Sequence, residues 1–255
     1  MIVLFSSNAF SLDGNPSIRF KHLTIEDGLP QNTVQAMLQD STGFLWLGTE
    51  EGLARYDGYS LKVFKHEPNN GNSLSGNNIV SLIEDSQGNI WVGIYGGGLN
   101  HYNPTTQQFT HYRHQTSDAN SLSDDFVLSL TEDRQGNLWV GTRSGGLNQF
   151  NHKSQKFTRY RHQASDPNSL SDNNVLSVIE DSQGNLWVGT RGGLNQFNFK
   201  TQQFTHYRHK ASDTNSLSDD EVLSVIEDSQ GKLWVGTRGG GLNQFNPTTQ
   251  KFTHY

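Results

Sequence analysis

The sequence lacks several features that would point to common functional classes. There is no Cys among the 255 residues, which excludes disulfides and thiolate metal sites. No run of Lys and Arg exceeds two residues, and the net charge is −6. A dedicated nucleic-acid binder needs a cationic surface to displace counterions, so we predict no nucleic-acid partner. No apolar stretch is long enough to span a bilayer.

Familiar catalytic motifs are also missing. The sequence has no Gly-x-Ser-x-Gly elbow, no phosphate-binding P-loop and no His-Glu-x-x-His. A nucleophile with its base, or a pair of catalytic carboxylates, normally appears once, whereas almost everything in this chain is repeated. We therefore predict that the chain is not an enzyme and that it uses no cofactor and no metal.

What the sequence does contain is one unit copied five times. Each copy carries the phrase Asp-x-x-Gly-x-x-Trp-x-Gly, and the intervals between the Trp residues are 45, 48, 48 and 47 residues. A fixed period in this range indicates a supersecondary unit repeated in tandem. The repeated Trp residues are Trp46, Trp91, Trp139, Trp187 and Trp234.

One repeat contains four short strand-forming runs separated by turn residues. In the fourth repeat we predict strands over 175–180, 186–190, 194–198 and 204–207, with Gly and Asp in the connecting turns. Four strands in a repeat of this length are typical of a β-propeller blade. We predict an all-β propeller in which the Trp residues pack between blades. The predicted blades are 34–66, 79–114, 127–162, 175–209 and 222–255.

The number of strands predicts an incomplete propeller. Residues 18–23 align with the fourth strand of a repeat, which gives five sets of the first three strands but six fourth strands. We interpret the chain as part of a longer propeller and expect an open arc or a strained five-blade ring. The outermost blades of an arc would expose apolar faces. We interpret residues 1–16 as the remnant of a signal peptide or a frayed tail.

The best candidate for a ligand site is the loop that follows the second strand of each blade. It lies on the same face of the propeller as the long polar loop between blades, for example residues 162–174. Arg, Tyr and acidic groups around a central mouth suit an anionic or polyhydroxylated ligand. The alternative is a solvated turn that was copied with the repeat. The candidate residues are Glu50, Tyr95, Arg143, Arg191 and Arg238.

The Asp-x-x-Gly turns raise the question of calcium binding. They lack the alternating carboxylates and the closing Glu of an EF-hand loop, so we predict that they are structural turns. The turns pair Asp40 with Gly43, Asp85 with Gly88, Asp133 with Gly136, Asp181 with Gly184 and Asp228 with Gly231.

Histidines recur in or just after the fourth strand. Because blades radiate from an axis, these side chains diverge and cannot share a metal, so we predict surface or inter-blade packing. They are His111, His206 and His254, and then His114, His162 and His209.

The first repeat resembles a known family. Residues 20–32 and 40–49, followed by 52–58, are similar to the opening of the periplasmic sensor region of bacterial two-component regulator propeller proteins. The later repeats match the family pattern Asp-x-x-Gly-Asn-Leu-Trp-Val-Gly-Thr, except that Ile94 replaces Thr and most later copies have an extra Gly. The resemblance covers residues 18–255.

The resemblance implies a periplasmic, seven-bladed ligand sensor, often doubled, in front of a β-sandwich, a membrane helix and a histidine kinase or diguanylate cyclase. It also implies an oligosaccharide ligand. Our leading hypothesis is a ligand-sensing or dimer-forming module, and we expect a homodimer formed through the propeller. Two alternatives remain open. One is a propeller lyase or hydrolase related to the streptogramin lyases, for which Glu50 and Tyr95 are the only unusual candidates. The other is a protein-binding scaffold.

Overall fold

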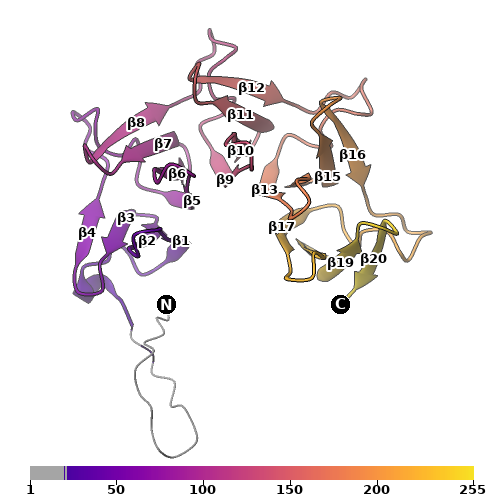
Figure 1. The fold of residues 1–255 in the computed structure, drawn as a ribbon, viewed down its shortest axis with the longest axis horizontal. Helices are drawn as coiled ribbons and strands as arrows, with labels where there is room; N and C mark the ends of the chain where they lie inside the picture. The colour runs from indigo at the N-terminus through magenta and orange to yellow at the C-terminus, as the bar shows by residue number, and fades with distance from the viewer. Residues whose placement is uncertain (1–19, 21) are drawn as a thin grey trace, which may run out of the picture.

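The computed structural model describes residue 20 and residues 22–255, so the interpretation of residues 1–16 falls outside the described part. The described residues form five four-stranded antiparallel sheets, each with its strands in chain order. Figure 1 shows the sheets as blades of an open arc, with the first strand of each blade inside and the fourth outside.

The first blade contains β1 (Val34–Gln39), β2 (Leu45–Thr49), β3 (Gly52–Tyr56) and β4 (Leu61–Phe64). The second contains β5 (Ile79–Glu84), β6 (Ile90–Ile94), β7 (Gly98–Asn103) and β8 (Gln108–Tyr112). The third contains β9 (Val127–Glu132), β10 (Leu138–Thr142), β11 (Leu147–Asn151) and β12 (Lys156–Tyr160). The fourth contains β13 (Val175–Glu180), β14 (Leu186–Thr190), β15 (Gly193–Asn198) and β16 (Gln203–Tyr207). The fifth contains β17 (Val222–Glu227), β18 (Leu233–Thr237), β19 (Leu242–Asn246) and β20 (Lys251–His254).

The strands predicted in the fourth repeat are confirmed. The strands β13 and β14 have the predicted bounds, and β15 and β16 each begin one residue earlier than predicted. The pattern is this readable because turn residues separate every pair of strands, and because the β-branched and aromatic residues are concentrated between the turns.

The blades contact one another through their inner strands in chain order. Strand β1 contacts β5, β5 contacts β9, β9 contacts β13, and β13 contacts β17. Among the described residues, no comparably extensive contact joins a strand of the first blade to a strand of the fifth. The arrangement is therefore the open arc, not the strained ring. We call the face of a blade directed toward the preceding blade its leading face and the opposite face its trailing face. At each of the four interfaces, the trailing face of one blade packs on the leading face of the next.

Each inter-blade core is built around one aromatic pair. The Trp on the second strand of one blade meets the aromatic ring on the third strand of the next, edge to face, and the first four Trp side chains are at most 1% exposed. Large aromatic side chains fill such an interface efficiently, and the prediction that the Trp residues pack between blades is confirmed for these four. The centroid distance is 5.3 Å in every pair: Trp46 with Tyr102, Trp91 with Phe150, Trp139 with Phe197 and Trp187 with Phe245.

The Asp of each Asp-x-x-Gly turn holds the Trp in place. In the fourth blade, Oδ2 of Asp181 accepts a hydrogen bond from Nε1 of Trp187 at 2.8 Å, while Oδ1 accepts the backbone N–H groups of Gln183 and Asn185. The same 2.8 Å bond to the indole is present in all five blades. These oxygens satisfy a buried donor and the turn itself, as expected for a structural turn.

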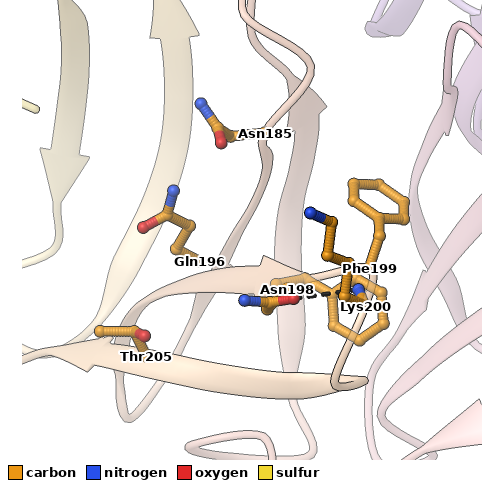
Figure 2. Close-up of a pocket in the computed structure, with 7 residues that line it drawn as sticks. Asn185, Gln196, Asn198, Phe199, Lys200 and Thr205 are labelled. Carbon is orange, nitrogen blue, oxygen red and sulfur yellow. Dashed lines mark hydrogen bonds between the residues drawn. The ribbon is translucent and has the colours of Figure 1, made fainter.

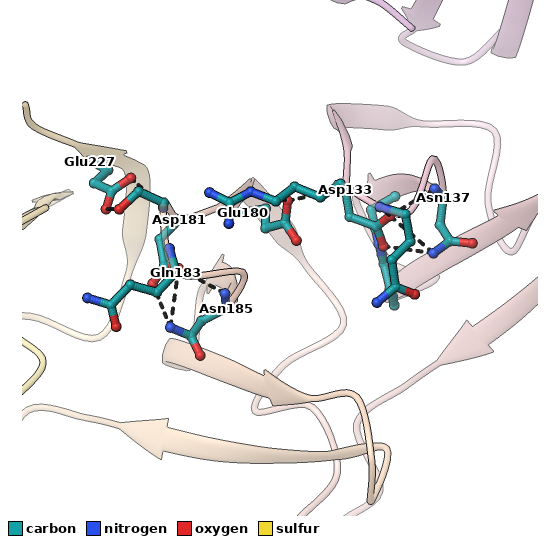
Figure 3. A network of polar contacts seen from close by, with 11 residues as sticks. Asp133, Asn137, Glu180, Asp181, Gln183, Asn185 and Glu227 are labelled. Carbon is teal, nitrogen blue, oxygen red and sulfur yellow. Dashed lines mark hydrogen bonds and ion pairs between the residues drawn. The ribbon is translucent and has the colours of Figure 1, made fainter. Parts of the chain in front are cut away.

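A second polar contact links each blade to the next (Figure 3). The Glu that ends the first strand of a blade accepts hydrogen bonds from the turn of the blade before it. Glu227 receives bonds from both the backbone N–H and the hydroxyl of Ser182, each at 2.6 Å. Glu180 receives the backbone N–H of Arg134 at 2.8 Å. The corresponding pairs at the other two interfaces are Ser41 with Glu84 and Ser86 with Glu132.

The additional strand predicted over residues 18–23 is not formed by its described residues, Phe20, His22 and Leu23. The described part has no further three-stranded sheet whose edge could pair with such a strand. Leu23 instead packs with Leu29 on the leading face of the first blade. Between these two leucines, the short 3₁₀ helix η1 (Ile25–Asp27) is capped by Thr24.

Both ends of the arc expose apolar side chains, as predicted. On the first blade Met37 is 60% exposed, and on the fifth blade Ile226 is 61% exposed and Tyr255 67%. The described residues include no helix with the length and apolar character needed to cross a membrane.

The Asp–Trp bond generates a stability prediction. We expect Asp181→Asn to lower the free energy of unfolding by about 1–3 kcal/mol, because an amide cannot accept from both the buried indole and the turn. The matched change Asp228→Asn should be less destabilising, since Trp234 is partly exposed and water can replace the lost acceptor. Urea denaturation followed by circular dichroism measures both, and equal losses would contradict the assigned role.

Candidate functional site

The five predicted ligand residues lie at equivalent places, each immediately after the second strand of its blade. The backbone N–H of Arg143 bonds to the carbonyl oxygen of Phe126, and that of Arg238 bonds to the carbonyl oxygen of Glu221, both at 2.9 Å. The residue after the second strand is therefore beside the residue before the first strand. We call these two positions in all five blades the inner rim: Glu50, Tyr95, Arg143, Arg191 and Arg238, with Thr33, Asn78, Phe126, Asn174 and Glu221.

The second and third blades share an aromatic and cationic group at the inner rim. The guanidinium of Arg143 donates a hydrogen bond to the hydroxyl of Tyr95. Its central carbon lies 5.6 Å from the ring centroid of Tyr95 and 5.7 Å from that of Phe126, within the range of cation–π contacts. The two rings meet edge to face at 4.7 Å.

The fourth and fifth blades share an ionic group. The carboxylate of Glu221 forms ion pairs with Nε of Arg191 at 3.2 Å and with Nε of Arg238 at 2.8 Å, while the side chains of the two arginines are 51% and 62% exposed. Exposed ion pairs contribute little to stability, about 0–1 kcal/mol. Because both guanidinium groups are more than half exposed, an anion from solvent can reach them and compete with the Glu221 carboxylate.

The structure thus divides the predicted residues into three groups. Glu50 stays within the first blade, where it accepts a hydrogen bond from Nε2 of Gln35 at 2.8 Å. Sequence reasoning missed Phe126 and Glu221. The available signal was that the residue before the first strand changes from blade to blade while its neighbours repeat. Three rim atoms, Oδ1 of Asn78, Oδ1 of Asn174 and Oε1 of Glu221, are buried without a hydrogen-bond partner.

The recurrent histidines brace the loops between blades. Nδ1 of His162 lies 2.8 Å from the carbonyl oxygen of Leu170, and His114 and His209 make the same contact in their own loops. Nε2 of His206 lies 2.6 Å from the carbonyl oxygen of Ser169. The corresponding bonds of His111 and His254 reach Ser73 and Ser216. Within the described residues, no three His, Asp or Glu side chains are grouped as metal ligands would be.

A hollow of about 350 Å³ lies in the fourth blade at the end away from the inner rim, beside the turns that hold Asn185 and Lys200 (Figure 2). Its remaining lining includes Gln196, Asn198 and Thr205. These three residue types recur at the same places in the third and fifth blades, so the lining carries little that distinguishes one blade from another. The inner rim is the better candidate site.

One further unrepeated group lies between the second and third blades. The rings of His101 and His152 both pack against Trp91, at 4.5 and 5.7 Å between centroids. Burial lowers the pKa of His101, and the neighbouring His152 lowers it further, although Asp85 acts in the opposite direction. Nε2 of His152 is buried without a partner. The third to fifth blades have Gln where the second has His101.

Comparison with known proteins places the repeats in a family. A model described as "Two component regulator propeller" matches residues 28–51, 73–96, 121–144, 169–192 and 216–239. Each match extends from the loop before a blade to the residues after its second strand, and so includes both inner-rim positions.

Individual relatives agree with this match. The chain is 40% identical over 75 residues to histidine kinase P4 of Formosa agariphila, a stretch that is 29% of this chain and 6% of the kinase. It superposes with a TM-score of 0.80 and 32% identity on the extracellular domain of BT3049, a candidate hybrid two component system of B. thetaiotaomicron, covering 91% of this chain and 31% of that one. The chain therefore spans a minor part of both.

Virginiamycin B lyase from Staphylococcus aureus also shares the fold. The TM-score is 0.68 with 14% identity, and the match covers 96% of this chain and 75% of the lyase. An identity this low shows a common propeller architecture and nothing about catalysis.

The half-buried histidines His101 and His206 predict a pH dependence. Burial lowers the pKa of both His101 and His206 in the folded state, so the unfolded chain binds more protons below the ordinary His value of about 6.5. The free energy of unfolding should therefore fall as the pH is lowered from 7 to 5. The change His101→Gln, which introduces the residue of the later blades, should flatten this slope, whereas His22→Gln at an exposed position should not. Urea denaturation at several pH values measures it, and an unchanged slope in His101→Gln would refute the assignment.

Proposed function

We propose that this chain, whose five blades are two component regulator propeller repeats, is the ligand-sensing part of a two-component signalling protein and lies outside the cytoplasm. The location is supported by the BT3049 structure described above, which is an extracellular domain. The proposal assigns the sensing role to the inner rim and assigns no catalysis to the chain.

The main support for this proposal is that the repeats differ from one another at the inner-rim positions. Residues 168–190 and 215–237 differ at three positions only, and one of them is the inner-rim pair Asn174 and Glu221. The other rim position is Glu in the first blade, Tyr in the second and Arg in the last three. A purely structural turn has no need of this variety, whereas a site that recognises an asymmetric molecule requires different groups around it.

The chemistry of the inner rim favours an acidic, polyhydroxylated ligand. Guanidinium groups bind carboxylate and sulfate through paired, charge-assisted hydrogen bonds, and Arg143, Arg191 and Arg238 supply three of them along the inner rim. Tyr95 and Phe126 add aromatic surface on which the apolar face of a sugar ring can pack. We therefore propose an acidic oligosaccharide as the ligand class.

Signalling would follow from a shift between two arrangements of the propeller and a neighbouring propeller, in a homodimer formed through the propeller. A ligand changes such an equilibrium only if it binds the two arrangements with different affinities. Displacing Glu221 from Arg191 and Arg238 provides one such difference, because it changes the charge of the rim that the fourth and fifth blades share.

The lyase and hydrolase alternative is not favoured by the contacts of its two candidate residues. Glu50 is bonded to Gln35, and Tyr95 is bonded to Arg143 and packed on Phe126. Among the residues that the structure describes, neither is paired with a nucleophile or with a second acid or base, which acid–base chemistry would require.

Calorimetric titration of the chain with oligogalacturonate, with maltohexaose as the neutral probe, tests the proposal. We expect binding of the acidic probe only, and a loss of about tenfold or more in affinity with Arg143→Ala, because a charge-assisted hydrogen bond contributes about 1.5–3 kcal/mol. The control Arg134→Ser removes the same charge from the opposite face and installs the residue of the other four blades, so it should bind as the unchanged chain does.

Two results would contradict the proposal. One is equal affinity of Arg143→Ala and the unchanged chain for the acidic probe, which would remove the inner rim from recognition. The other is mass-spectrometric detection of shortened probe after incubation, which would establish turnover and favour the enzymatic alternative.

A further inference from the structure

The first strand of every blade shifts its register next to the inner rim. In the fourth blade Val175 is opposite Thr190 and Ser177 is opposite Gly189, so Leu176 has no partner on the neighbouring strand. A bulge of this kind redirects a side chain, and bulges are common beside binding sites. The shift occurs at the same place in all five blades. We call the five unpaired residues the bulge residues: Gln35, Val80, Leu128, Leu176 and Leu223.

Four of the bulge residues are aliphatic and lie outside the packed cores. In the fourth blade, Val175 and Val178 pack in the core shared with the third blade. Leu176, by contrast, belongs to none of the hydrophobic clusters found among the described residues, and the same is true of Val80, Leu128 and Leu223. All four are at least partly exposed. Because neighbouring first strands contact one another along the inner side of the arc (Figure 1), these side chains form an apolar row that a ligand can cover.

The bulge residues are neighbours of the inner rim. In the first blade, Nε2 of Gln35 donates a hydrogen bond to Glu50 at 2.8 Å, so the side chain of a bulge residue reaches the rim residue of its own blade. The first blade also shows that the propeller repeat accepts a polar residue at this position. The aliphatic side chains of the later blades are therefore not needed to form the bulge.

A buried acceptor lies two residues before the bulge in the second and fourth blades. Oδ1 of Asn174 has no hydrogen-bond partner, although this side chain is only 9% exposed. Oδ1 of Asn78 is likewise buried and unpartnered. Buried polar atoms are normally paired, and leaving one unpaired is costly. A ligand that brings a donor to Asn174 would therefore gain affinity.

The contacts of the equivalent residues indicate where Asn174 lies along the rim. Phe126 packs on Tyr95 of the preceding blade, and Glu221 pairs with Arg191 of the preceding blade. By equivalence, Asn174 occupies the side of the fourth blade nearest to Arg143. The junction of the third and fourth blades thus combines a guanidinium group, an unpaired acceptor and the aliphatic side chain of Leu176.

We propose that the ligand of the inner rim is an acidic oligosaccharide that contains N-acetylated amino sugars; this inference rests on the function proposed above. An N-acetyl group carries one N–H donor and one methyl group, which match Oδ1 of Asn174 and the side chain of Leu176. An acidic group on the neighbouring sugar would bind Arg143. A chain of uronic acids alone offers hydroxyl donors but no methyl group for the bulge residues.

Two probes that differ only in their methyl groups test the proposal. The first is a hyaluronan hexasaccharide, in which glucuronate alternates with N-acetylglucosamine, and the second is the same hexasaccharide with N-formyl in place of N-acetyl. Both keep every carboxylate and every amide N–H. In calorimetric titration of the chain, we expect the N-acetyl probe to bind at least about fourfold more tightly, which is the effect of burying one methyl group.

Three variants separate the roles of the residues. Leu176→Gln, which introduces the bulge residue of the first blade, should retain binding but remove the difference between the two probes. Asn174→Ala should weaken both probes equally, by about fivefold, because both donate the same N–H. The control Thr205→Ala changes an exposed side chain of the same blade away from the rim, and it should alter neither affinity. Circular dichroism verifies that each variant is folded.

Equal affinity of the unchanged chain for the N-acetyl and N-formyl probes would overturn the inference without the need for any variant. An undiminished preference for the N-acetyl probe in folded Leu176→Gln would also overturn it. If oligogalacturonate binds through Arg143 while the two amide probes do not bind, this inference alone is wrong. If none of the three acidic probes binds, the proposed function is wrong and this inference fails with it.

Discussion

The arrangement of the molecule depends on how each blade fixes the position of one Trp ring. The carboxylate of the Asp-x-x-Gly turn divides its two oxygens between the turn and the indole N–H, as Asp181 does with Gln183 and Trp187. The buried donor is satisfied, so the ring can lie between two sheets without leaving a polar group unpaired. The next blade then packs its third-strand aromatic residue on that ring and binds its own Glu to the same turn. One short turn therefore closes a hairpin, orients the core of the interface and sets the position of the following blade.

The reliance on local contacts between neighbouring blades has a functional consequence. Because local contacts between neighbours determine the architecture, stability is distributed along the arc as it is in other repeat proteins. Residues outside those contacts are free to vary, and at the inner rim they do. Tyr95, Phe126 and Glu221 interrupt the repeat where the inner strands end, and each of them contacts an Arg of its own blade or the next. The scaffold is repetitive, while the surface proposed to bind a ligand is not.

Most of the fold could be predicted from the sequence, because the signals for its strands and turns are local and occur in all five repeats. Turn residues bracket strands such as β13 and β14 closely enough to give their bounds. Two kinds of contact could not be predicted. The bond between Asp181 and Trp187 depends on how two strands separated by a turn come together in space. The contact between Ser182 and Glu227 depends on how two blades, here 45 residues apart in sequence, come together. The prediction of a strand at 18–23 is wrong for its described residues. Sequence similarity to a repeat does not form a strand when no neighbouring sheet is present to pair with it. At the candidate site, the five loop residues were found by position alone. Their division into three groups required the side-chain contacts of Glu50, Tyr95 and Glu221.

The most direct test of this account is hydrogen exchange at the five Trp indole N–H groups, followed by NMR of the ¹⁵N-labelled chain. The account predicts slow exchange for Trp46, Trp91, Trp139 and Trp187, whose rings are enclosed between blades, and faster exchange for Trp234, whose bond to Asp228 is not covered by another blade. Five indole groups that exchange at the same rate would contradict it, because the turn contacts would then not act together with the neighbouring blade.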